Sequence, residues 1–184
     1  PAQIGPGGSI AVKVEATGVP AERLAAVTES ITKVLGSRFE GYGMSLNEFA
    51  ATQCVVKYKE ETAGRLNNLR YLEADGKVLQ KPAEVDGVKT SVEMTIVNTD
   101  IGKETIFKYG VEMPAMSSRM AVPLDSADKA PADAYLAARL DWLAEQFAGL
   151  DLPYYLSKGI LGTTRLPIVV PRVSGPAEGA EMAK

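Results

Sequence analysis

The chain has 184 residues, 46% of them hydrophobic, and a formal net charge of −3. This length suits one domain, and the near-neutral charge excludes a globally basic nucleic-acid-binding protein, so any basic surface has to be local. No stretch reaches the ~18 consecutive apolar residues of a membrane-spanning helix, and the first ten residues lack the basic and apolar regions of a signal peptide.

The N-terminal part, residues 1–48, mixes patterned segments with glycine-rich ones. Residues 1–8 are rich in glycine and proline and predict an arm. Residues 10–15 alternate between small or apolar and charged side chains, which is typical of a half-buried strand. Residues 21–35 carry apolar side chains at helical spacing and predict a helix, although their β-branched residues leave a pair of strands as an alternative. Residues 36–48 hold three glycines without a phosphate-binding motif and predict a loop.

The middle of the chain predicts a run of strands. The strand patterns cover 49–60, 66–74, 77–80, 88–98 and 104–113, and an extended piece follows at 120–124. Asp75-Gly76 and Asp86-Gly87 are hairpin signals. Because tight turns join antiparallel neighbours, we interpret this region as a β-meander.

The clearest helical signal lies between Pro131 and Leu161. Pro131 suits a first helical turn, and Gly149 is a plausible end for a long helix. A shorter helix is predicted over 152–161. The apolar stripe of the long helix is wide for one small sheet, so a large core or another subunit should cover it; the stripe consists of Leu136, Leu140, Leu143 and Phe147.

Strands in series followed by helices predict an α+β fold, with an antiparallel meander sheet and two C-terminal helices. We expect a single domain over residues 1–162. Its parts are an N-terminal arm, strand and uncertain helix or hairpin (1–48), a sheet (49–124) and a helical pair (128–161), and an extension follows over 163–184.

The residue types present exclude several chemistries. The chain has no histidine and one cysteine, Cys54. Ser-His-Asp and Cys-His catalytic groups, histidine-ligated metal sites and thiolate clusters are therefore excluded. The acidic pairs Glu60-Glu61 and Asp125/Asp128 lack the spacing of a calcium loop and suit solvated turns and helix caps better. We expect no enzyme activity, no cofactor and no metal.

Basic side chains recur on the predicted strands, at Lys57, Lys59, Arg70, Lys89 and Lys108. They could form a basic patch on one sheet face, with Tyr58, Tyr71 or Tyr109 available for base stacking. The alternative is an ordinary solvated face of mixed charge, since glutamates are interspersed at positions 60, 73, 93 and 112.

In the order and spacing of elements, residues 50–162 resemble the coat proteins of single-stranded RNA bacteriophages. The resemblance rests on the strand ETIFKYGVEM and the helical region PADAYLAARLDWLAEQFAGLDLPYYLSKGIL that follows it. Members of that family have an N-terminal hairpin, a five-stranded antiparallel sheet and two C-terminal helices that interlock with a partner. This chain is longer, its residues 21–35 predict a helix in place of the hairpin, and residues 163–184 are additional.

The resemblance implies a structural capsid protein that forms an obligate homodimer, assembles into an icosahedral shell and binds single-stranded RNA on its inner sheet face. The long helix would pack across the dimer partner through Leu136, Leu140, Leu143 and Phe147. The implied RNA-binding residues are Lys57, Lys59, Arg70, Lys89, Lys108 and Tyr109. The implied location is the virion, assembled in the cytoplasm of a host bacterium, with no membrane partner.

Two other function classes stay open. One is a different phage or secretion assembly subunit without an RNA role. The other is a small ligand-binding domain or enzyme, whose β-α-β start over residues 10–60 would be ferredoxin-like, although the sequence displays no convergent set of polar groups.

Overall fold

A computed structural model describes residues 5–100, 105–117 and 119–152, with side chains described outside 105–107. The elements are β1 (Ser9–Thr17), α1 (Ala21–Gly41), β2 (Ser45–Leu46), β3 (Thr52–Leu72), β4 (Val78–Asn98), β5 (Thr105–Met113), the 3-10 turn η1 (Leu124–Ser126) and α2 (Pro131–Ala148). The predicted extension at 163–184 and nearly all of the predicted helix at 152–161 lie outside the described residues.

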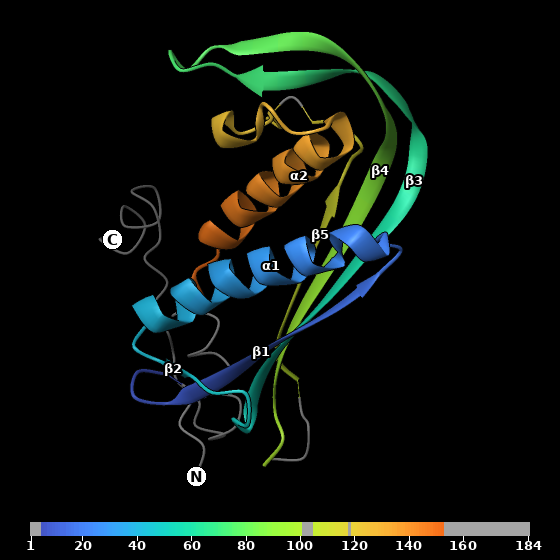
Figure 1. The fold of residues 1–184 in the computed structure, drawn as a ribbon. Helices are drawn as coiled ribbons and strands as arrows, with labels where there is room; N and C mark the ends of the chain where they lie inside the picture. The colour runs from blue at the N-terminus through green and yellow to red at the C-terminus, as the bar shows by residue number, and fades with distance from the viewer. Residues whose placement is uncertain (1–4, 101–104, 118, 153–184) are drawn as a thin grey trace, which may run out of the picture.

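The five strands form one sheet in the order β2-β1-β3-β4-β5. Strands β3, β4 and β5 pair antiparallel, as the predicted meander requires, whereas β1 pairs parallel with both β2 and β3. A parallel neighbour needs a long crossover, and α1 provides it. The predicted α+β class is confirmed, and Figure 1 shows both helices on the same side of the sheet.

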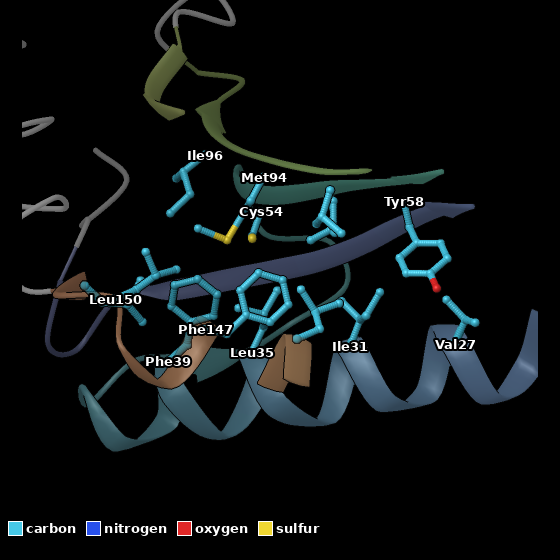
Figure 2. Packing of buried hydrophobic residues seen from close by; sticks show 14 of the residues in the cluster. Val27, Ile31, Leu35, Phe39, Cys54, Tyr58, Met94, Ile96, Phe147 and Leu150 are labelled. Carbon is cyan, nitrogen blue, oxygen red and sulfur yellow. The ribbon is translucent and has the colours of Figure 1, made fainter. Parts of the chain in front are cut away.

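Residues 21–35 form a helix that continues to Gly41, so the alternative of two strands is wrong. Its apolar residues Val27, Ile31, Leu35 and Phe39 recur every fourth position and are buried against the sheet (Figure 2). An α-helix turns once in 3.6 residues, so this spacing keeps all four side chains on one face. The local pattern therefore indicated the helix but not its end, because residues 36–41 were predicted to belong to a loop.

The predicted strand number is wrong in the middle of the chain, because β3 and β4 are continuous strands of 21 residues each. The turn at Asp75-Gly76 is present, and Gly76 has a positive φ of 84°. At Asp86-Gly87 the chain does not reverse. Instead the β3–β4 register shifts between Thr62 and Arg65, and a Cβ on Gly87 would lie 2.6 Å from the Ala63 carbonyl oxygen. Glycine is needed there for close strand approach at a bulge.

The long β3–β4 hairpin bends, and its outer half curves over the start of α2 (Figure 1). A second apolar cluster fills the space beneath it, with Leu69, Tyr71, Val122 and Tyr135 among its buried members. The predicted extended piece at 120–124 contributes here, because Val122 forms a β-bridge with Tyr71. The bend thus gives α2 a cover on the side that the flat part of the sheet does not reach.

The apolar stripe of α2 is buried largely within the chain itself. Leu136, Leu143 and Phe147 are 4%, 1% and 1% exposed and belong to the main core. Their burial therefore needs no dimer partner, in contrast to the packing that the coat-protein resemblance implied. Leu140 is half-buried at the surface between the two helices. The sequence argument missed α1 as a second cover for this stripe.

Candidate functional site

Four of the six predicted RNA-binding residues share the sheet face that points away from the helices. Lys57 and Lys59 are exposed on β3, Lys89 lies on β4 and Lys108 on β5. Strand alternation and register bring them together, since Glu61 pairs with Lys89 and Thr95 with Lys108 across the strands.

Glutamates offset the positive charge of this face. The shortest nitrogen–oxygen distances are 2.6 Å for Lys59–Glu61, 3.3 Å for Lys89–Glu112 and 3.3 Å for Lys108–Glu93. Lys57 lies between Glu15 and Glu93 in the strand register. The face is thus of mixed charge, which is the alternative that the interspersed glutamates indicated.

The other two predicted RNA-binding residues lie elsewhere. Tyr109 is next to Lys108 in β5 and therefore points to the opposite, core-facing side, where its ring centroid is 6.4 Å from that of Phe147. The Arg70 guanidinium donates a hydrogen bond to the Ser117 carbonyl near the outer half of the hairpin. Tyr109 cannot stack a base beside these lysines, so that part of the prediction is wrong.

A buried ionic network joins β3 to α2. The Arg139 guanidinium nitrogen Nη1 lies 2.6 Å from the Glu60 carboxylate, and the two side chains are only 4% and 6% exposed. The Tyr58 hydroxyl donates to the same carboxylate at 2.6 Å, and Nη1 also donates to the Tyr58 and Thr90 hydroxyl oxygens at 3.2 and 3.3 Å. Glu60 is therefore a buried ion-pair partner, and the predicted solvated-turn role is wrong for it.

The strand pattern held a signal for this network, because Glu60 continues the inward-facing series Cys54, Val56 and Tyr58. Burial raises the pKa of the Tyr58 hydroxyl, and the Glu60 charge raises it further against the opposing effect of Arg139. Tyr58 is consequently a neutral donor at physiological pH. Nothing in the α2 sequence alone distinguishes Arg139 from a solvent-exposed arginine.

Tyr135 holds the other side of the Arg139 guanidinium. Its ring centroid is 4.9 Å from the guanidinium carbon, in a cation–π arrangement. Its hydroxyl accepts a hydrogen bond from the Val88 amide at 3.1 Å and donates to the Ala115 carbonyl. Burial raises the pKa of Tyr135 as well. Arg139 is thus fixed between an aromatic ring and a carboxylate.

Next to this network lies a cavity of about 290 Å³, which we name the polar pocket. Its charged lining residues are Arg23 on α1, Glu60 on β3, Asp86 on β4 and Arg139 on α2. Arg23 is held by Asp133 at 3.1 Å. Asp86 makes no ion pair or hydrogen bond through its side chain to any other described residue. Gly18 also lines the pocket, where its backbone approaches β3 closely. A Cβ at this position would lie 2.2 Å from the Glu60 carbonyl oxygen, so only glycine fits.

Within the described residues, no group of three or more acidic or cysteine side chains is arranged to hold a metal ion. Among the same residues, no helix combines the length and the apolar character needed to cross a membrane.

No protein-family profile and no curated protein matches this chain. Among solved structures, the chain resembles a Helicobacter pylori protein described as a homologue of a neuraminyllactose-binding hemagglutinin. The TM-score is 0.51 at 14% sequence identity, over 85% of this chain and 89% of that chain. At this identity the likeness shows the fold alone. This resemblance does not concern phage coat proteins, so the coat-protein hypothesis stays a prediction.

Proposed function

We propose that this chain is a binding module that takes a small polar molecule of no net charge into the polar pocket. The observation that carries the proposal is a partly open cavity whose lining includes four charged residues from four different elements, of which Glu60 and Arg139 are buried and Asp86 is exposed at the mouth. A concave site with a few convergent polar groups is the usual form of a small-molecule site.

The charges of the lining favour a ligand without net charge. Arg23 and Arg139 supply two positive charges, and Glu60 and Asp86 supply two negative ones, so the formal sum is zero. The volume of about 290 Å³ lies at the low end of the ~300–1,000 Å³ range of ligand pockets. Both properties suit a metabolite-sized zwitterion or hydroxylated molecule.

Asp86 is the group through which the pocket would hold a ligand. Glu60 and Arg139 bind each other, and Arg23 binds Asp133, so their geometry is fixed before a ligand arrives. The Asp86 carboxylate has no partner among the described residues and is available to accept a hydrogen bond from a ligand hydroxyl or ammonium group. A preformed pocket with one free acceptor limits the ordering cost of binding.

The description of the Helicobacter protein refers to binding of neuraminyllactose. Because the likeness shows only the fold, we use that anionic trisaccharide as a charged comparison beside neutral monosaccharides and free amino acids. Titration of the labelled protein, followed by amide NMR shifts, should give saturable shifts around Arg23, Val88 and Tyr135 for at least one of the ligands without net charge.

Asp86→Asn should weaken that binding by about tenfold or more, the loss expected for a charge-assisted hydrogen bond of ~1.5–3 kcal/mol. The matched control is Glu73→Gln, an exposed acid at the end of the hairpin and outside the pocket. If no ligand gives saturable shifts at the pocket, or if Asp86→Asn binds as well as the parent protein, this function is wrong.

The structural coat-protein function remains a separate prediction. Electron microscopy and the 260/280 nm absorbance ratio of the purified protein test it directly. Closed particles that carry nucleic acid would support it, and a small protein free of nucleic acid would argue against it.

A further inference from the structure

A continuous groove follows the boundary between α1 and α2 on the side away from the sheet. Two hollows of about 710 and 470 Å³ compose it, and both are lined by Ala137 and Leu140. The helices run side by side in the same direction (Figure 1). Arg23 near the start of α1 binds Asp133 near the start of α2, and Arg38 near the end of α1 donates to the Leu150 carbonyl just beyond α2.

The surface of this groove would allow another helix to approach closely. Small side chains from both helices contribute to its lining, at Ala26, Ser30, Ser37, Ala137, Ala144 and Ala148. Val34 and Leu140 are half-buried near its middle and add apolar contact area. Small residues at a helix surface leave room for the side chains of a facing helix in the intervening grooves.

The two walls of the groove carry opposite charges at each end. Towards the start of the helices, Glu22 on the α1 wall faces Lys129 on the other wall. Further along, Lys33 on the α1 wall faces Asp141 on the α2 wall. Among the described residues, Lys33, Lys129 and Asp141 make no ion pair. Arg23 and Arg38 also line the α1 wall, and Asp125 and Asp133 also line the other wall. Apart from Glu22 and Lys129, the α1 wall is therefore basic and the opposite wall acidic.

A two-fold axis that runs along the groove would exchange its walls between two copies of the chain. Because the helices are parallel, such an axis places α1 of one copy over α2 of the other at the same level. Lys33 of each copy then faces Asp141 of the other, and Glu22 faces Lys129. A two-fold interface has to be self-complementary in this way, and each pairing occurs twice.

We propose that two copies of this chain associate through the groove between α1 and α2, with Leu140 at the centre of the interface. The 18 residues of α2 span about 27 Å, and two helices of ~10 Å width give a contact face of roughly 500 Å² in projection. Accessible area exceeds projected area, so the face approaches the ~800 Å² per partner of a standard interface. The expected product is a concentration-dependent dimer.

The first test measures the molecular mass in solution across a concentration series by sedimentation velocity. Leu140→Asp places a charge at the centre of the interface and should weaken the dimer by about a hundredfold or more, in line with a burial cost of a few kcal/mol. Leu24→Asp is the matched control, because Leu24 is an exposed leucine of α1, 43% accessible, outside the groove. Circular dichroism checks that both variants remain folded.

The second test exchanges charges and keeps the proposal falsifiable if Leu140→Asp fails to fold. Lys33→Glu alone opposes Asp141 with a like charge, and Asp141→Lys alone opposes Lys33 in the same way, so each should weaken self-association by about tenfold or more. A mixture of the two variants forms a heterodimer in which both contacts again join opposite charges. Dimer formation should therefore return only on mixing.

Three results would overturn the proposal. The parent protein stays monomeric at every concentration, Leu140→Asp associates as well as Leu24→Asp, or the mixed charge variants fail to associate. The residues changed in these tests, Lys33, Leu140 and Asp141, do not line the polar pocket. The outcome for self-association is therefore independent of whether the pocket binds a ligand.

Discussion

Replacing Arg139 by leucine will remove the cation from the buried pair with Glu60. Both side chains are at least nine-tenths buried, so the carboxylate would keep only the Tyr58 hydroxyl as a close donor, at 2.6 Å. Removing one partner of a buried ion pair costs about 3–5 kcal/mol, because the remaining charge is neither solvated nor paired. For a protein of this size, the melting temperature should fall by roughly 6–20 °C.

Urea unfolding followed by circular dichroism gives the free energy of unfolding, and a double-mutant cycle separates the pair from its surroundings. Glu60→Leu alone should also destabilise, because it leaves the Arg139 charge buried without its carboxylate. The double variant leaves no buried charge. Its remaining cost should be about 1–3 kcal/mol, for the unpaired Tyr58 hydroxyl, and therefore lower than the sum of the two single costs.

The reasoning fails if Arg139→Leu costs less than about 1 kcal/mol, or if the double variant costs as much as both single variants together. The control is Lys108→Leu, which breaks an exposed pair with Glu93 whose side chains are 63% and 45% accessible. That change should cost no more than about 1 kcal/mol, because water screens the pair.

Three further outcomes are expected. Burial raises the pKa of the Cys54 thiol to about 12. A thiol reagent at pH 8 should therefore label the folded protein far more slowly than the urea-unfolded protein, because the thiolate is the reactive form. Equal labelling rates would show that β3 opens readily. In urea melts, Gly18→Ala should lower the free energy of unfolding more than Gly76→Ala does. Both glycines have a positive φ, but only at Gly18 would an added Cβ clash with a backbone atom, the Glu60 carbonyl oxygen. Equal losses of stability would show that this clash does not matter. Burial, together with the Asp125 charge, raises the pKa of Asp141. The ionised carboxylate therefore destabilises the folded monomer fully above the raised pKa, and this penalty disappears as pH falls from that value to the ordinary Asp pKa of ~3.9. Asp141→Asn should therefore stabilise dilute monomer slightly at pH 7 while weakening the dimer, and a loss of monomer stability in urea melts would contradict this assignment.

Sequence patterns are informative for the elements whose signal is local. The helical spacing of residues 21–35 predicted most of α1, and the Pro131–Gly149 limits match α2 closely, whereas the loop predicted at 36–48 is wrong over 36–41, where α1 continues. Strand alternation also placed Lys57 and Lys59 on one face. These patterns are reliable because each depends on the geometry of a single element, 3.6 residues per turn or two per repeat.

Which elements contact one another could not be predicted from these local patterns. The same Asp-Gly signal makes a turn at Asp75-Gly76 and lies in a continuous strand at Asp86-Gly87, because glycine serves both tight turns and close strand approach. The parallel position of β1 depends on where α1 returns the chain. The pair of Glu60 and Arg139 joins residues 79 positions apart. Strand alternation puts Glu60 on the inward face of β3, whereas nothing in the α2 sequence marks Arg139 as its buried partner. Whether a charged side chain is buried or solvated is set by the partner that folding brings to it, and no local pattern contains that partner.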